Sequence, residues 1–279
     1  MLPTAARLQF VEQGFLVLPG FRSAARVAAL RERAARIVDA FDADAQRSVF
    51  TTADQARTAD AWFLGSGDAV RCFFEEEALD AEGRLRVPKE HAINKIGHAM
   101  HDLDAVYDAF SHGDDLAALA ASISLERPQI RQSMHIFKPP AIGGEVRWPQ
   151  DAPYLRPEPM SVTGFWFALE DATVDNGCLW VEPGGHRGPL RERFVREGDA
   201  VRLETVDATP WPAPEQTVPL PVEAGTLVVF HGLLPHASAP NRSAVSRQAY
   251  TLHTADAGSR WAADNWLRRR ADLPLRGFA

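Results

Sequence analysis

The sequence is poor in cysteine, with only Cys72 and Cys178 among its 279 residues. Two cysteines are too few for a disulfide framework, and their separation excludes a CxxC redox or zinc motif. We therefore expect two buried free thiols. This cysteine usage fits a reducing compartment, and we expect a cytoplasmic protein.

Long hydrophobic runs are also absent. No stretch approaches 18 consecutive apolar residues, so the sequence predicts no membrane-spanning helix and no membrane partner. The first residues, MLPTAARLQFVEQGF, lack the basic region and following apolar run of a signal peptide.

An excess of positive charge is the third missing feature. The formal net charge is −7, so the electrostatic footprint of a nucleic-acid-binding protein is not present. Hydrophobic residues make up 46% of the chain and charged residues 24%, which is typical of a soluble globular protein. The charge balance therefore predicts no nucleic-acid partner.

The N-terminal part of the chain, residues 1–127, is predicted to be mostly helical. Ser23 can cap a helix over 23–40, in which Val27, Leu30 and Ala34 recur at helical spacing. Further helices are expected over 101–110 and 114–124. The Pro-rich segment 207–215 is predicted to be a surface loop.

The remaining part, residues 128–279, changes to short β-prone runs that alternate with Gly, Pro and Asp. Strands are expected over 129–137, 161–169, 177–181 and 225–230. Repeated short strands favour a sandwich or barrel. No long linker separates the two parts, so we expect a single domain, residues 1–279, in which the helices pack on one β core.

One constellation in the second part indicates chemistry. In the segment 225–253, an apolar strand leads to His236, and Arg247 follows 11 positions later on the next strand. The imidazole can ligate a metal, and the guanidinium can hold a carboxylate by a bidentate hydrogen-bonded fork. Many hairpins contain both residues, so this pattern alone is weak.

Longer stretches of the chain match a known family. These are GFLVLPGF near the start, INKIGHAMHDLD at 93–104, SMHIFKPP at 133–140, GGEV at 143–146, EDATVDNGCLWVEPGGHRG at 170–188 and SRQAYTLH at 246–253. In this order, over roughly residues 8 to 270, they resemble the phytanoyl-CoA dioxygenase family. The resemblance implies a mainly β protein with N-terminal helices and a double-stranded β-helix (jelly-roll, cupin-like) core. It also implies Fe(II) as cofactor and 2-oxoglutarate as cosubstrate.

The family's site residues transfer to this sequence position by position. The resemblance implies that Asp151 and His236 are catalytic metal ligands, within a His-x-Asp…His triad that leaves open positions on the iron. It further implies that Arg247 and Ser238 grip the 2-oxoglutarate carboxylate. Three more cosubstrate-binding positions are implied: Lys95, Met134 and Trp166. The alternative for Met134 and Trp166 is ordinary core packing, and for Lys95 it is a solvated lysine.

The sequence departs from the family at the first metal ligand. The residue two positions before Asp151 is Pro149, which has no side-chain donor and cannot ligate iron. Gln150 lies on the wrong alternation of a strand to replace it. Because proline also lacks a backbone N–H, the strand is expected to be loosened here. His135 and His231 are alternative ligands, although alternation points His135 away from the site.

Two functions therefore remain open. The first is an Fe(II)/2-oxoglutarate-dependent dioxygenase that hydroxylates a small organic or acyl substrate. The second is a catalytically impaired family member that binds 2-oxoglutarate or a related carboxylate without oxygenase activity.

Overall fold

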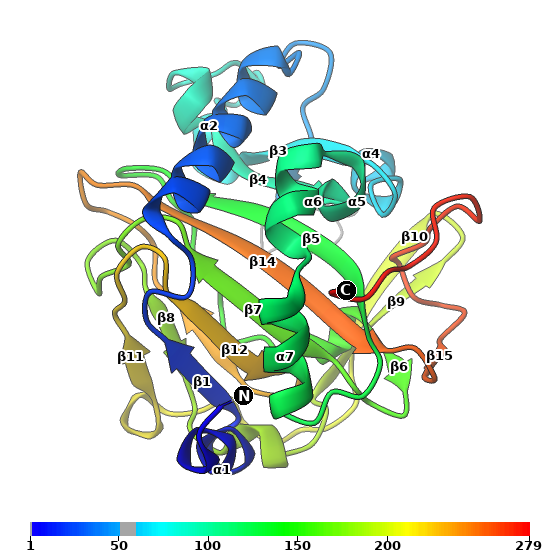
Figure 1. The fold of residues 1–279 in the computed structure, drawn as a ribbon. Helices are drawn as coiled ribbons and strands as arrows, with labels where there is room; N and C mark the ends of the chain where they lie inside the picture. Colours follow the sequence, from blue (N-terminus) through cyan, green and yellow to red (C-terminus); the bar gives the residue numbers. More distant parts are fainter. Residues whose placement is uncertain (1, 51–59) are drawn as a thin grey trace.

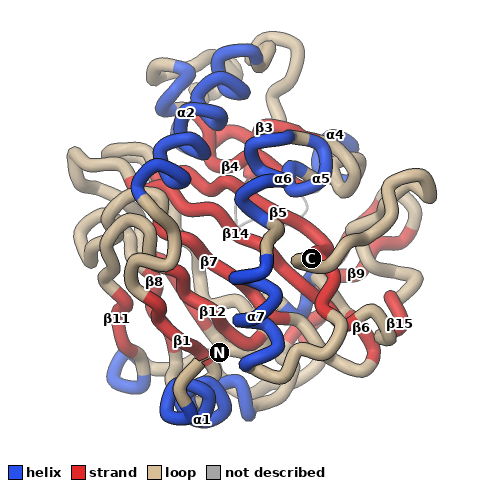
Figure 2. Tube along the Cα trace, viewed as in Figure 1, coloured by secondary structure: helices blue, strands red, loops and turns tan. Residues whose placement is uncertain are grey.

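The protein is described by a computed structural model that covers residues 2–50 and 60–279. Its main feature is a large sheet of eight strands (Figures 1 and 2). In spatial order the strands are β1 (Phe15–Leu18), β12 (Leu227–His231), β7 (Thr163–Ala168), β14 (Arg247–Asp256), β5 (Pro128–Lys138), β4 (Ile93–His98), β3 (Val70–Glu75) and β2 (Val49–Phe50). Neighbours pair antiparallel except β2 and β3, which run parallel.

A smaller sheet completes the jelly roll. Its strands, in order, are β11 (Val218–Leu220), β8 (Leu179–Val181) and β13 (His236–Ser238). Side chains of both sheets form one apolar cluster, in which Trp166 and Phe230 of the large sheet join Val181 of the small one. Two separate two-stranded sheets are also present, β9 (Glu192–Glu197) with β10 (Ala200–Thr205), and β6 (Pro157–Glu158) with β15 (Arg260–Trp261).

The helices are α1 (Thr4–Gln13), α2 (Ala24–Ala40), α4 (Ala61–Leu64), α5 (Met100–Leu103), α6 (Ala105–Ser111) and α7 (Asp114–Ser122). Of these, α2, α5, α6 and α7 pack on the outer face of the large sheet, where α6 and α7 lie across β5, β14 and β7 (Figure 1). A second apolar cluster joins Leu30 and Phe110 of the helices to Phe167 and Tyr250 of the sheet. None of the helices in the described ranges is long and apolar enough to cross a membrane.

Several local predictions are confirmed. The Ser23 side chain caps α2 by accepting a hydrogen bond from the Arg26 N–H, and Cys72 and Cys178 are buried free thiols. The predicted strands correspond to β5, β7, β8 and β12, each within two residues at either end. The segment 207–213 has no regular structure, as expected for a loop.

Residues 1–127 contain more helix than strand, but they also supply β1, β2, β3 and β4 to the large sheet, which the sequence did not predict. One helix prediction in this part is wrong. The helix expected over 101–110 is broken into α5 and α6 at Asp104, whose carboxylate accepts from the N–H groups of Val106 and Tyr107. A short acidic side chain that captures backbone donors favours a new helix start over continuation.

Candidate active site

The candidate site lies between the two sheets, in a cavity of about 410 Å³. Strand alternation builds its walls, since residues two apart on a strand face the same side. On β14, Arg247, Thr251 and His253 line the cavity, whereas Tyr250 belongs to the apolar cluster under the helices. All the residues that the resemblance identified as site residues also line it: Lys95, Met134, Asp151, Trp166, His236, Ser238 and Arg247.

Arg247 is 2% exposed and is held in one orientation. Its Nε donates to the Gly177 carbonyl at 3.1 Å, and its Nη2 donates to the Ser238 hydroxyl at 3.0 Å. Burial lowers the pKa of Arg247 to about 10, against the opposing effects of Cys178 and Glu170. Within the described residues it makes no ion pair, so a buried cation stands beside the cavity without a carboxylate partner.

Lys95 is a second buried cation in the cavity. Its Nζ lies 3.1 Å from the centre of the Phe50 ring and 3.8 Å from the Met134 sulfur. Burial lowers the pKa of Lys95 to about 7, although Glu75 and Asp151 act to raise it. The pKa of the Lys95 ammonium therefore lies near neutral pH. The group lines a cavity that is large enough for a small anion.

Asp151 and His236 approach each other as the metal-ligand hypothesis requires. Asp151 precedes a short 3-10 turn, Ala152–Tyr154, and its Oδ1 lies 3.7 Å from Nε2 of His236. The His236 Nδ1 donates to the Leu234 carbonyl at 3.0 Å, which leaves the lone pair on Nε2. Nε2 is thus the His236 nitrogen that is directed at the Asp151 carboxylate.

Pro149 stands where the resemblance implies a third ligand, and the chain around it is loosened as predicted. Val146 makes an isolated bridge to Ser238, and beyond it the pairing continues only through the Pro149 carbonyl, which accepts from the His236 N–H. Gln150 points elsewhere and is fully bonded: its amide donates to the Pro189 and Leu233 carbonyls and accepts from the Arg191 N–H. It therefore anchors the segment without reaching the site.

Neither alternative histidine reaches the site. His135 lies on the helix side of the sheet, between the Tyr107 hydroxyl at 2.8 Å and the Gln248 amide at 3.1 Å. His231 packs beside His186 with ring centres 5.4 Å apart. Both imidazoles belong to other packing environments.

His253 is a site residue that the sequence reasoning did not single out. Its Nε2 lies 2.9 Å from Asp151 Oδ2, and its Nδ1 lies 3.2 Å from the Gln132 amide. Burial would raise the pKa of Asp151, but the charges of His253 and His236, the hydrogen bond with His253 and the charge of Lys95 outweigh it and lower that pKa. The sequence contained one indication of its place. His253 follows Arg247 by an even number of positions, so strand alternation puts both side chains on one face of β14.

Asp151 and His236 are ligands of the right kind for iron, but they are two where the family pattern has three. A carboxylate and an imidazole are normal ligands of non-haem Fe(II), and His236 has the backbone-bonded Nδ1 typical of a metal ligand. However, as they lie in residues 2–50 and 60–279, no three His, Cys, Asp or Glu side chains form a group that could hold a metal ion.

Known proteins resemble this chain over most of its length. The family model described as "Phytanoyl-CoA dioxygenase (PhyH)" matches residues 10–249. Phytanoyl-CoA dioxygenase 1 of Oryza sativa subsp. japonica is 44% identical over 96% of this chain and 94% of its own. Phytanoyl-CoA dioxygenase domain-containing protein 1 of Bos taurus is 43% identical over 96% of this chain and 95% of its own.

Among solved structures, the non-heme alpha ketoglutarate dependent carbocyclase SnoK from nogalamycin biosynthesis has the same fold. Its TM-score is 0.67 at 19% identity, with 93% of this chain and 86% of that chain covered. The jelly-roll fold with N-terminal helices is therefore confirmed. Together with the match over residues 10–249, these likenesses show that the chain belongs to the phytanoyl-CoA dioxygenase family.

Proposed function

We propose that this protein is a 2-oxoglutarate-dependent oxygenase that hydroxylates a small organic or acyl substrate. In this proposal 2-oxoglutarate is held at Arg247, and Fe(II) at Asp151 and His236. Membership of the family supports the reaction class, and SnoK, which shares the fold, is described as alpha ketoglutarate dependent.

The observation that carries the proposal is the buried Arg247. A buried charge without a partner is costly, so a protein that retains one normally supplies a counter-ion by binding it. Ser238 and Gly177 fix the guanidinium in the same cavity that receives Asp151 and His236. A dicarboxylate with one carboxylate on Arg247 supplies the missing counter-ion, and its other carboxylate then lies near Asp151 and His236.

Fe(II) at Asp151 and His236 would supply the redox chemistry, activating dioxygen as 2-oxoglutarate is converted to succinate and carbon dioxide. The chain's own contribution is to bind and orient. Asp151 and His236 present a carboxylate oxygen and an imidazole lone pair to one point, and Arg247 anchors the cosubstrate.

The substrate is proposed to enter beside the aromatic end of the cavity. Phe63, Phe194 and Trp266 line this end, and Phe63 and Trp266 stack with ring centres 4.3 Å apart. Such a lining favours a small molecule with an apolar body over a polyanion. The net charge of −7 likewise favours a small-molecule partner over nucleic acid.

A second candidate function is favoured by Pro149. If two side chains do not retain iron, the same cavity would bind 2-oxoglutarate or a related carboxylate without oxygenase activity. Iron content and succinate formation separate the two functions, because only the oxygenase requires them.

The cosubstrate pocket is tested by Arg247→Ala. Removal of a charge-assisted bidentate contact that leaves the partner charge buried costs about 2–5 kcal/mol. We expect the affinity for 2-oxoglutarate, measured by isothermal titration calorimetry, to fall by at least tenfold.

Arg131→Ala is the matched control. Arg131 is also a buried arginine of the large sheet, but its guanidinium lies 4.8 Å from the Trp261 ring centre, outside the cavity. Its loss is expected to affect stability and to leave 2-oxoglutarate affinity unchanged. Equal affinity of Arg247→Ala and the wild type would refute the proposed pocket.

A further inference from the structure

His98 is a buried histidine at the aromatic end of the cavity, and the proposed cosubstrate and iron positions do not use it. It is 1% exposed and meets the rings of Phe63 and Trp266 edge-on, with ring centres 5.4 Å and 5.1 Å away. We propose that His98 Nε2 accepts a hydrogen bond from a hydroxyl group of the substrate. This role rests on the proposed function, because it names the substrate class of the same cavity: a small molecule with an apolar body and a hydroxyl.

The position of the proton on the His98 ring is fixed by Ser66. The Ser66 hydroxyl oxygen lies 2.6 Å from the Phe63 carbonyl oxygen and 2.7 Å from His98 Nδ1. A carbonyl has no proton to give, so the hydroxyl donates its one proton to the carbonyl and accepts from Nδ1–H. Because a neutral imidazole carries a single N–H, the other ring nitrogen, Nε2, retains its lone pair.

Burial keeps this imidazole neutral. It lowers the pKa of His98 well below the ordinary value, and the charges of Lys95 and His253 lower that pKa further. Nε2 is therefore a hydrogen-bond acceptor at neutral pH and not a donor. An acceptor selects a group that supplies a proton, which excludes an ionised carboxylate or phosphate from this position.

Nε2 is the polar atom that His98 presents to the cavity. It makes no hydrogen bond within residues 2–50 and 60–279, and unlike the indole nitrogen of Trp266 it is not fully enclosed by packing. A polar atom in a largely aromatic wall is costly unless a ligand or water bonds to it. In small-molecule sites, such isolated polar groups fix the orientation of an otherwise apolar ligand.

The sheet register places His98 at the Asp151 end of the cavity. His98 lies level with Leu252 of β14, because both pair with the same residue of β5. Arg247 is five residues from Leu252, which corresponds to about 17 Å along a strand. His253, the next residue, bonds to Asp151. A hydroxyl bound at His98 would therefore lie at the end where Asp151 stands, and the proposed 2-oxoglutarate anchor lies at the other.

The test uses two probes that differ in a single donor. Benzyl alcohol has an aromatic body and a hydroxyl, whereas benzyl methyl ether keeps the body and the oxygen but has no proton to donate. We expect the wild type to bind benzyl alcohol about fivefold more tightly than the ether in a ligand-observed NMR titration, since one net hydrogen bond contributes about that factor.

Two substitutions of His98 separate its two ring nitrogens. His98→Asn keeps an amide near the place of Nδ1, where it can bond to Ser66, and removes the group at Nε2. His98→Gln places an amide near the position of Nε2. The preference for the alcohol is expected to disappear in His98→Asn and to persist in part in His98→Gln. The ratio of the two affinities is compared, because any space that the substitution opens changes the binding of both probes.

His231→Asn is the matched control, since His231 packs against His186 outside the cavity, and its preference is expected to equal that of the wild type. Thermal melting checks that each variant is folded. Equal affinity of the wild type for the two probes, binding of neither probe, or a preference that survives unchanged in His98→Asn would overturn the proposal.

The proposed function fails by different measurements, namely the absence of 2-oxoglutarate binding and of succinate formation. A preference for the alcohol that depends on His98, in a protein that lacks both, would confirm the hydroxyl site and refute the oxygenase. Succinate formation without any such preference would support the oxygenase and overturn the hydroxyl site.

Discussion

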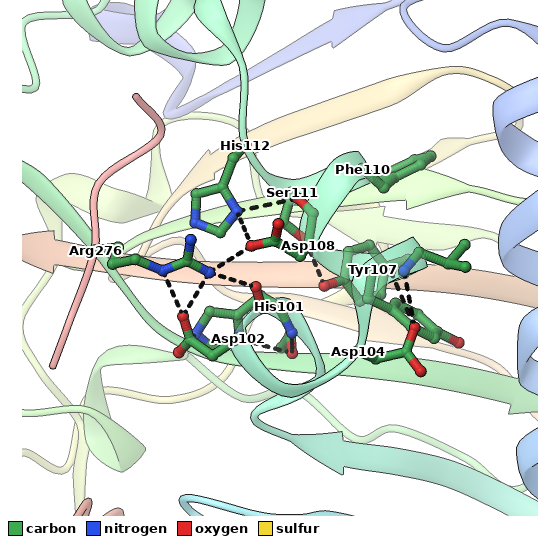
Figure 3. Close-up of polar contacts among 12 residues, drawn as sticks. His101, Asp102, Asp104, Tyr107, Asp108, Phe110, Ser111, His112 and Arg276 are labelled. Carbon is green, nitrogen blue, oxygen red and sulfur yellow. Dashed lines mark hydrogen bonds and ion pairs between the residues drawn. The ribbon is translucent and has the colours of Figure 1, made fainter. Parts of the chain in front are cut away.

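Asp102 and Asp151 are both carboxylates held against buried histidines, yet their surroundings differ in one respect. Asp102 lies beside His101, with Nε2 to Oδ2 at 3.0 Å, and also pairs with Arg269 and Arg276 (Figure 3 shows the Arg276 side). Asp151 has two histidines and no arginine within ion-pair distance in the described residues. The Asp102 side chain is 2% exposed, whereas that of Asp151 is 17% exposed and faces the cavity.

This difference separates a structural carboxylate from one that is proposed to bind a metal. Arginine stays charged and occupies the oxygens of Asp102 permanently, which joins the C-terminal segment to α5. Burial would raise the pKa of Asp102, but His101 and Arg269 outweigh it and hold the pKa well below its ordinary value. Imidazoles can instead be neutral and offer lone pairs, which is what the proposed metal site at Asp151 and His236 requires.

The largest expected effect is that of Asp102→Asn on stability. Removal of this charge leaves the Arg269 guanidinium, which is only 10% exposed, without its carboxylate. Breaking a buried pair from one side costs about 3–5 kcal/mol. We expect a fall of that size in the free energy of unfolding, measured by urea denaturation.

Asp151→Asn is the matched comparison. It is expected to change the free energy of unfolding by less than about 1 kcal/mol, because no buried arginine depends on Asp151, and to weaken metal binding. If both variants lose the same stability, the distinction between the two carboxylates is wrong.

The pH dependence of Asp102 gives the second prediction. Its folded-state pKa lies below the ordinary value of 3.8, so its stabilising contribution is complete above that pH and declines as the pH falls below it. The stability difference between the wild type and Asp102→Asn is therefore expected to be constant between about pH 5 and 8 and to shrink below about pH 4. Denaturation curves of both proteins across this range provide the measurement. A difference that grows toward acid would contradict the sign.

Pro149→His tests whether Asp151 belongs to a metal site. Positions 149 and 151 would present an imidazole and a carboxylate to the same point, and metal affinity is expected to rise by more than about tenfold. Succinate production from 2-oxoglutarate is expected to appear or increase. A folded variant with the new imidazole beside Asp151 and no gain in metal affinity would show that the cavity no longer supports the family's chemistry.

The smallest expected effect is that of Arg276→Ala. The Arg276 side chain is 44% exposed, and Asp102 retains Arg269 and His101 without it. Exposed ion pairs contribute up to about 1 kcal/mol, so the free energy of unfolding should fall by no more than that. A loss comparable to that of Asp102→Asn would mean that Arg276, and not Arg269, neutralises the carboxylate.

Local patterns in the sequence were sufficient for much of the fold. The spacing of Val27, Leu30 and Ala34 with Ser23 before them determined α2, since helix periodicity and capping are properties of neighbouring residues. The short β-prone runs after Pro128 likewise predicted β5, β7, β8 and β12. The strands β3 and β4 were not expected, because residues 70–75 and 93–98 become strands through pairing with each other and with β5.

For the site, the sequence by itself determined which side chains share a face. Alternation places Arg247 and His253 on the same side of β14, and collinear motifs identified Asp151 and His236. The tertiary structure alone decided that Asp151 meets His253, a contact between residues 102 positions apart. The physical reason is that alternation is fixed by the backbone of one strand, whereas the approach of a loop to that strand depends on the packing of the whole jelly roll.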